Sequence, residues 1–174
     1  RLLPSREQRL LNMTTNVLVL CTHNSARSVL AEAMFNHWAD VLGVDARAYS
    51  AGAAPSGCVH AQALAVLSAA GVDVSGLSSK NMEQFAEVGA PTMRVVITVC
   101  DSAAAQPCPI WPGAPVRAHW SYPDPSAADV ADQAQRFDLT RQAIAYRMVQ
   151  LVQLPFDALS NAELHPLVHR IGAS

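Results

Sequence analysis

A thiol and a guanidinium stand six residues apart in the segment Cys21-Thr-His-Asn-Ser-Ala-Arg27-Ser28. An apolar, β-branched run at residues 16–20 precedes the segment and a helical pattern follows it, so we expect a strand, a tight loop and a helix. Backbone N–H groups at a helix N-terminus carry partial positive charge, which binds oxyanions and stabilises a thiolate. Arg27 adds donors that match a tetrahedral oxyanion. We therefore expect Cys21 to have a lowered pKa and to attack phosphorus or arsenic.

The residues between this strand and helix form the expected oxyanion-binding loop. Asn24 suits a left-handed turn, because its short polar side chain tolerates a positive φ. Ser28 stands where its hydroxyl can donate a hydrogen bond to the thiolate. The alternative is a buried strand-end cysteine without a catalytic role, but the strand and helix on either side favour the nucleophile. The predicted loop comprises Thr22, His23, Asn24, Ser25, Ala26 and Arg27.

Strands alternate with helices along the rest of the chain, according to its hydrophobic periodicity. Short apolar runs indicate four strands, at residues 16–20, 46–50, 93–99 and 116–120. Helical spacing indicates helices that end near Gly43, Gly71 and Pro155, a short helix within 81–88 and a helical tail at 156–174. Residues 101–114, which contain three prolines, are predicted to be irregular. This order favours a mainly parallel sheet with functional loops beyond the carboxyl ends of its strands.

Composition excludes several classes of protein. The 174 residues suit one domain, and a net charge of −2 without a lysine or arginine stripe argues against nucleic-acid binding. Apolar runs stay below the roughly 18 residues of a membrane span. Four cysteines without a C-x-x-C pair favour neither a disulfide scaffold nor structural zinc, so we expect no metal and a cytoplasmic location. We expect residues 1–15 to be a leader outside the fold, 16–153 the catalytic domain and 154–174 a helical tail.

Several motifs, in the same order along the chain, resemble those of the low-molecular-weight tyrosine phosphatases and of the arsenate reductases that share their fold. The resemblance covers roughly residues 16–153. It rests on VLVLCTHNSARSVLAEAMF (17–35), YSAG (49–52), GVDVSGLSSK (71–80), VVITVCD (95–101) and HWSYPDPS (119–126). It implies an α/β fold, a three-layer α/β/α sandwich around a four-stranded parallel sheet.

The resemblance also implies roles for an aspartate and two further cysteines. Asp124 precedes a proline and would otherwise read as a turn residue, but it matches the acid that protonates the leaving oxygen. Cys100 and Cys108 match the thiols that release arsenite and carry a disulfide to a reductant. Their spacing is one residue longer than in thioredoxin-coupled reductases, which weakens the match of Cys108 more than that of Cys100. No bound cofactor is expected, and thioredoxin or glutaredoxin with glutathione would supply the reducing thiol.

Three positions separate the two activities within the resemblance. Phosphatases usually carry a second loop cysteine at the position of Ala26 and paired tyrosines at the positions of Ser126 and Ala127. These departures favour an arsenate reductase. One alternative is a phosphomonoester hydrolase that does not need Cys100, and another is an oxyanion-binding or redox-sensing module without turnover. In each case the expected ligand is an arsenate or phosphate oxyanion.

Further residues are expected to support the loop from behind. In some relatives the residues matching Asn24, Glu32 and Ser50 bind a potassium ion, together with an acidic residue where this chain has Lys80. The Lys80 ammonium could replace that cation, or Lys80 could be an ordinary surface lysine. If it replaces the cation, activity will not depend on potassium.

Overall fold

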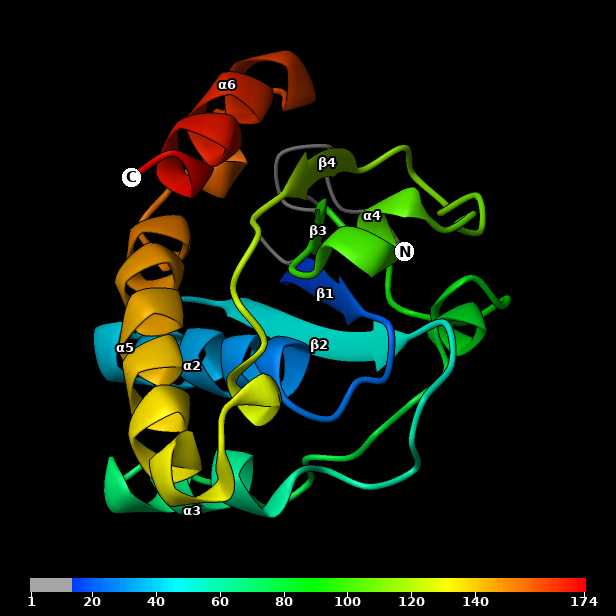
Figure 1. Cartoon of the computed structure of the whole chain (residues 1–174). Helices are drawn as coiled ribbons and strands as arrows, with labels where there is room; N and C mark the ends of the chain where they lie inside the picture. The colour runs from blue at the N-terminus through cyan, green and yellow to red at the C-terminus, as the bar shows by residue number, and fades with distance from the viewer. Residues whose placement is uncertain (1–13) are drawn as a thin grey trace.

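Four parallel strands form one sheet in the order β2-β1-β3-β4 (Figure 1). This is a computed structural model that describes residues 14–174, so most of the predicted leader lies outside the described residues and stays a prediction. The predicted four-stranded parallel sheet is confirmed. Because β1 pairs with both β2 and β3, their carboxyl ends lie side by side. The strands are β1 (Thr15–Cys21), β2 (Ala46–Gly52), β3 (Val95–Thr98) and β4 (Val116–His119).

Long helices cover one face of the sheet. α2 (Arg27–Leu42) packs on β1 and β2, and α5 (Gln133–Val152) packs on α2 and on α3 (Ala61–Ala69) (Figure 1). Alternate side chains of β1, including Val17 and Val19, belong to the cluster that these helices form. This larger hydrophobic cluster fixes α2 against the strand that leads into the predicted loop.

Shorter elements cover the opposite face. Leu18 and Leu20, the other set of alternate side chains in β1, cluster with Phe85 of the 3₁₀ helix η1 (Met82–Phe85) and with Trp111 of an irregular segment. The α/β fold class is confirmed, with one outer layer of the sandwich built from short helices and irregular chain.

The short helix α4 (Asp101–Ala105) corrects the expectation that residues 101–114 are irregular throughout. Asp101 lies in its first turn, where a negative charge interacts favourably with the helix N-terminus, and three alanines follow Ser102. A helix of five residues is too short to produce an apolar periodicity. The sequence pattern therefore does not predict it.

The C-terminal segment forms η4 (Phe156–Ala158) and α6 (Asn161–Gly172). Ser160 and Glu163 make a capping box at the start of α6. α6 packs on β4, and the Trp120 indole N–H donates a hydrogen bond of 3.2 Å to a carbonyl of α6. This helix therefore shares the core that surrounds the sheet.

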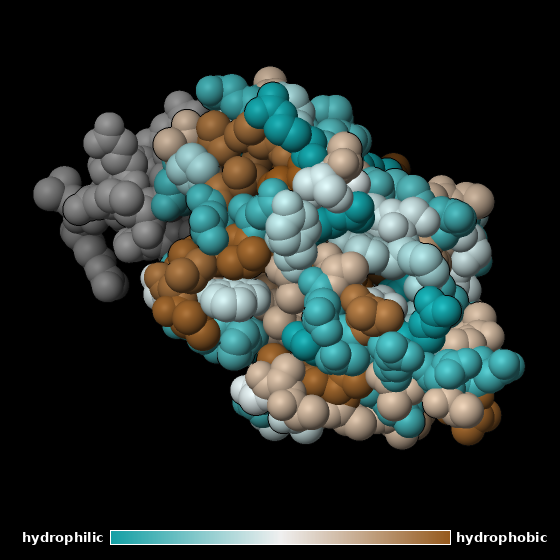
Figure 2. Space-filling model, turned by 60° about the vertical axis from the view of Figure 1, so that its left-hand side comes forward, coloured by the Kyte–Doolittle hydropathy of each residue, from teal (hydrophilic) through white to brown (hydrophobic). Residues whose placement is uncertain are grey.

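The surface mixes polar and apolar side chains. On the face that Figure 2 shows, hydrophobic areas are separated by hydrophilic ones. Among residues 14–174, none of the helices combines the length and the apolarity that crossing a bilayer requires.

Candidate active site

A buried amide holds the loop after β1. Asn24 has the predicted left-handed backbone, with φ of 47°, and its side chain is fully buried. Its N–H groups donate to the hydroxyls of Ser28 (2.8 Å) and Ser50 (2.9 Å), and its oxygen accepts from the Lys80 backbone N–H (2.8 Å). The Ser28 hydroxyl accepts this bond, which leaves its own proton available, so its predicted bond to the thiolate stays a prediction. These bonds join the loop to α2, β2 and the Lys80 segment, so its backbone is preorganised.

The carbonyl groups of the loop are occupied by a neighbouring segment. Those of Thr22, His23 and Ser25 accept from the backbone N–H groups of Ala54 (2.9 Å), Ser56 (3.0 Å) and His60 (2.9 Å). In a trans peptide the N–H points opposite to the C=O, so the N–H groups that follow these carbonyls face the other side. No hydrogen bond of the described chain uses the N–H groups of residues 23–26. They are therefore free to bind an oxyanion, which is the predicted role of the loop.

Gly52, at the end of β2, allows this close approach of loop and sheet. A Cβ here would collide with the Thr22 carbonyl oxygen and lie 3.0 Å from the Cys21 carbonyl oxygen. Only glycine avoids that collision. The sequence marks Gly52 merely as the end of the YSAG motif, so this role emerges from the structure.

Glu32 and Lys80 meet behind the loop. Glu32 Oε1 accepts the Ser50 N–H at 2.9 Å and lies 3.7 Å from Lys80 Nζ, which also donates to the Ser78 carbonyl at 2.7 Å. Burial raises the pKa of Glu32, and the charge of Lys80 opposes that rise. The structure therefore brings together Asn24 and the three other residues expected to support the loop.

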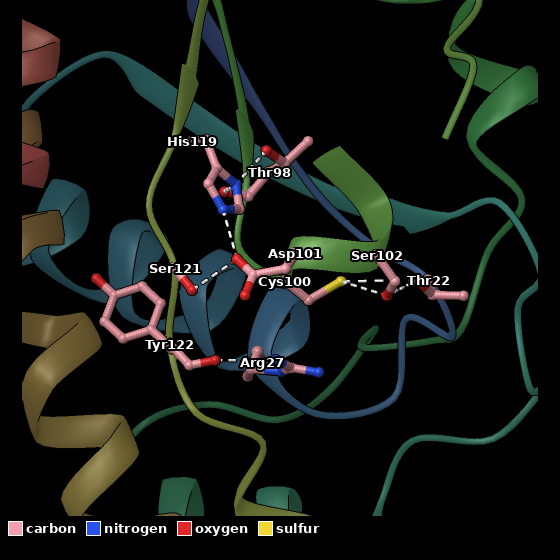
Figure 3. Close-up of polar contacts among 9 residues, drawn as sticks. All are labelled: Thr22, Arg27, Thr98, Cys100, Asp101, Ser102, His119, Ser121 and Tyr122. Carbon is pink, nitrogen blue, oxygen red and sulfur yellow. Dashed lines mark hydrogen bonds and ion pairs between the residues drawn. The ribbon is translucent and has the colours of Figure 1, made fainter. Parts of the chain in front are cut away.

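Arg27 has a fixed orientation beside the loop. Its Nη1 donates to the Tyr122 carbonyl at 2.9 Å (Figure 3), and its Nη2 lies 3.8 Å from Asp124 Oδ2. Tyr122 is held in turn by Arg147 of α5, whose guanidinium carbon lies 4.9 Å from the ring centroid. The structure thus brings the predicted guanidinium and the predicted acid together.

Asp124 has a lowered pKa in the ligand-free site. Burial raises the pKa of this carboxyl, but hydrogen bonds from the Ser126 hydroxyl (2.7 Å) and N–H (3.0 Å), together with the Arg27 charge, bring it below its ordinary value. A general acid must carry a proton when the leaving group departs. A bound oxyanion adds negative charge beside Asp124 and raises its pKa, so we expect protonation to accompany binding.

Cys100 lies just beyond β3, at the N-cap position of α4. Its buried sulfur is 3.6 Å from Thr22 Oγ1 and 3.5 Å from Ser102 Oγ, and these two hydroxyls are 2.7 Å apart (Figure 3). It also lies close enough to the Cys21 thiol for each group to shift the pKa of the other. The two cysteines, far apart in the sequence, meet because β1 and β3 are neighbours in a parallel sheet.

The two thiols influence each other's pKa. The hydrogen bond to Cys100 and burial raise the pKa of Cys21, whereas Arg27 and the Thr22 N–H lower it. The hydrogen bond to Cys21 lowers the pKa of Cys100 against the effect of burial, and Ser102 lowers it further. The lowered pKa that the sequence predicts for Cys21 therefore belongs to the pair in the ligand-free site, because a second sulfur shares the positive field of the loop. The pair loses its first proton readily and its second reluctantly.

Cys108 stands apart from this pair. Its half-buried sulfur lies 3.8 Å from the Gln106 carbonyl oxygen, and it lines a cavity of about 350 Å³ together with Trp111. Within residues 14–174 it makes no hydrogen bond to Cys21 or Cys100, and all four cysteines are free thiols. The structure therefore pairs two of the three predicted relay thiols.

Known proteins resemble this chain in sequence across the residues that form the site. The family model described as low molecular weight phosphotyrosine protein phosphatase matches residues 16–161. The arsenate reductase of Bacillus subtilis is 30% identical over 140 residues, which cover 79% of this chain and 94% of that protein. The glutaredoxin arsenate reductase of Synechocystis sp. is 32% identical over 109 residues, which cover 63% of this chain and 77% of that protein.

A solved structure agrees in fold. The thioredoxin-dependent arsenate reductase of Corynebacterium glutamicum is 25% identical, with a TM-score of 0.56, and the match covers 84% of this chain and 67% of that chain. The family match includes the loop, the paired cysteines and Asp124. This chain therefore belongs to the low molecular weight phosphotyrosine protein phosphatase family.

Proposed function

We propose that this protein is an arsenate reductase that uses a relay of cysteines. One observation carries the proposal: Cys21 and Cys100 lie at the carboxyl ends of neighbouring parallel strands, where each thiol shifts the pKa of the other. A phosphatase needs one thiolate, whereas reduction of arsenic by two electrons needs a second thiol within reach of the first. The similarity to named arsenate reductases supports the same activity.

The first step is a displacement at arsenic. Arsenate binds to the loop N–H groups and to Arg27, which also stabilise the charge that develops during attack. The Cys21 thiolate attacks while the proton of the thiol pair resides on Cys100. The departing hydroxide leaves as water after Asp124 protonates it. This step leaves arsenic bonded to the Cys21 sulfur.

The second step transfers two electrons to arsenic. Cys100 gives its proton to an oxygen of the arsenic adduct and its thiolate attacks the Cys21 sulfur. The S–S bond forms, and the As–S bond breaks with its electron pair going to arsenic. Arsenite leaves, and two thiolates have become one disulfide, so the electrons balance. The Ser102 and Thr22 hydroxyls also lower the pKa of Cys100 and stay in place when Cys21 carries arsenic, so they favour this attack, because only the thiolate is a strong nucleophile.

Cys108 then accepts the disulfide. Its thiolate attacks the Cys100 sulfur, which frees Cys21 and produces a Cys100–Cys108 disulfide. This exchange requires the irregular segment around Cys108 to shift, because the thiol makes no bond to the pair in the reduced structure. We further propose that thioredoxin or glutaredoxin reduces the new disulfide in the cytoplasm. Relatives named as glutaredoxin and thioredoxin-dependent reductases support a thiol donor.

Phosphomonoester hydrolysis is the second candidate. The matching family model is that of phosphatases, and the arrangement of Cys21, Arg27 and Asp124 suffices for attack at phosphorus. Water would then hydrolyse the phosphocysteine, and Cys100 would have no part.

Arsenate-dependent NADPH oxidation tests the proposal, with thioredoxin and glutaredoxin systems supplied in turn. We expect turnover that is lost in both Cys21→Ser and Cys100→Ser. Cys58→Ser is the matched control, because Cys58 is exposed and belongs to no part of the site. The proposal fails if no system supports turnover while an aryl phosphate is hydrolysed in a Cys21-dependent, Cys100-independent way.

A further inference from the structure

A histidine and a serine beside the end of β4 hold the first residue of α4. His119 Nε2 and Ser121 Oγ each lie 2.9 Å from Asp101 Oδ1 (Figure 3). The other ring nitrogen, Nδ1, lies 2.7 Å from Thr98 Oγ1 and 3.1 Å from the Thr98 carbonyl oxygen. Both nitrogens of His119 are therefore engaged, one by β3 and one by α4, which fixes the orientation of the ring. The hydrogen bond from His119, and then that from Ser121, lowers the pKa of Asp101, so it takes part as a carboxylate.

α4 depends on such outside contacts. It has five residues, Asp101–Ala105, and a helix of that length is not stable by itself in water. Its N-cap residue, Cys100, makes no capping hydrogen bond through its side chain. Because Asp101 directly follows Cys100, a hydrogen bond to the Asp101 carboxylate also restrains the backbone that carries the Cys100 thiol.

A second contact restrains the same turn from the opposite side. Ser102 Oγ lies 2.7 Å from Thr22 Oγ1 of the oxyanion loop. Cys100 is thus followed by one residue that binds His119 and by another that binds the loop (Figure 3). These two contacts hold the thiol where it meets Cys21.

We propose that His119 is a positioning residue for the second thiol: through Asp101 it holds Cys100 against Cys21 for the disulfide-forming step. This inference rests on the proposed function, because a phosphatase would not use Cys100. None of the recorded hydrogen bonds of His119 involves either sulfur or the N–H groups of the loop. His119 therefore contacts neither the nucleophile nor the oxyanion-binding N–H groups directly.

The exposure of the contact makes the effect local. The Asp101 side chain is 85% exposed, and exposed ion pairs add little to the stability of the whole fold. Loss of the contact will instead increase the share of molecules in which α4 is displaced or frayed. The Cys21–Cys100 step should slow while the protein remains folded.

A single-turnover experiment tests the proposal. In a Cys108→Ser background the relay stops at the first disulfide, so Cys21–Cys100 formation can be followed after mixing with arsenate, by acid quench and mass spectrometry. We expect His119→Ala to slow it about fivefold, a loss typical of an exposed contact. His169→Ala is the matched control. His119 and His169 both line the cavity of about 350 Å³ beside Cys108, but His169 Nε2 lies 3.1 Å from the Arg117 carbonyl oxygen, which is outside α4. The control should change the rate by less than about twofold.

Two further readouts separate positioning from general damage. Phosphate should protect Cys21 from alkylation equally well in the parent and in His119→Ala. Asp101→Ala should slow disulfide formation as much as His119→Ala, and the double variant should be no slower, because the two residues act through one contact.

The inference is overturned if His119→Ala forms the disulfide at the parental rate, if phosphate protection falls in parallel with it, or if the two substitutions are additive. If the parent itself forms no disulfide with arsenate, the proposed function fails and the inference falls with it. If the parent forms the disulfide and His119→Ala forms it at the same rate, only the positioning role of His119 is contradicted.

Discussion

The loop that carries Cys21 and the segment that carries Cys100 and Cys108 are held by different kinds of contact. At the centre of the loop, Asn24 is fully buried and makes three hydrogen bonds. The other segment contains a helix of five residues whose first side chain, Asp101, is 85% exposed, and it ends in an irregular stretch with Ile110 at the surface.

This difference matches the demands of the proposed steps. Stabilising the charge that develops at arsenic requires donors that are already in place, and buried hydrogen bonds provide them. Passing a disulfide from Cys21 to Cys100 and on to Cys108 requires sulfur atoms to exchange partners. Weak, exposed contacts allow that exchange at little cost in stability.

The largest effect should come from the rigid region. Arg27→Lys replaces a planar set of donors by a single ammonium, and we expect arsenate reduction to fall about 100-fold. Phosphate protection of Cys21 should weaken as well. Arg141→Lys is the control, since Arg141 pairs with Asp138 on α5 at 3.0 Å, away from the loop. Unchanged phosphate protection in Arg27→Lys would contradict the assigned role.

A smaller effect is expected when the loop loses its central amide. Asn24→Ala leaves buried hydroxyls and an N–H without their partner, so the free energy of unfolding should fall by about 2 kcal/mol. Activity should drop about tenfold as the loop loses its preorganised shape. Chemical denaturation measures the free energy of unfolding, and steady-state rates measure the activity.

Asn36→Ala serves as the control for this substitution. Asn36 also joins α2 to β2, through hydrogen bonds of 2.8 and 3.1 Å to the backbone of Ala48, but it lies outside the loop. It should lower stability without lowering kcat. Equal loss of kcat in Asn24→Ala and Asn36→Ala would contradict the claim that Asn24 preorganises the loop for catalysis.

Cys21 belongs to one region and Cys100 to the other, and the pH dependence of their alkylation tests whether the two thiols interact. The hydrogen bond to Cys21 is the largest cause of the lowered pKa of Cys100. In the parent, the Cys100 thiolate therefore persists at low pH and disappears only as the pH falls through that lowered value. Cys21→Ala should move the alkylation midpoint of Cys100 upward, toward the ordinary value of about 8.5. Alkylation of Cys58, read in the same samples, should not change, and an unmoved Cys100 midpoint would mean that the thiols do not interact.

The smallest effect concerns the cation. Because Lys80 Nζ lies 3.7 Å from Glu32 Oε1, we expect the parent to be equally active in potassium and sodium buffers, within about twofold. Lys80→Asp should lower the rate in sodium and regain part of it in potassium. Strong potassium activation of the parent would remove Lys80 from this role.

Sequence reasoning predicts the rigid region well, because its signals are local. A cysteine, five residues and an arginine between a strand and a helix indicate the loop, and Asn24 has the predicted positive φ. The meeting of Cys21 and Cys100 follows from a general rule, that the carboxyl ends of parallel strands share one edge of the sheet.

The second region depends on contacts between distant residues, which no local pattern reports. α4 is too short to produce a periodicity, and the contact of His119 with Asp101 forms only once β4 lies beside β3. The effect of Cys100 on the pKa of Cys21 is absent from the prediction for the same reason, since this thiol follows another strand.

A single turnover without any external reductant tests the central claim most directly. Reduced protein is mixed with arsenate, and arsenite is measured together with the disulfides of the quenched protein. We expect about one arsenite per chain, with an equal amount of a disulfide that includes Cys100, because each turnover consumes two thiols. Arsenite release at the parental rate from Cys100→Ser, or no arsenite from a parent that still hydrolyses an aryl phosphate, would contradict the account.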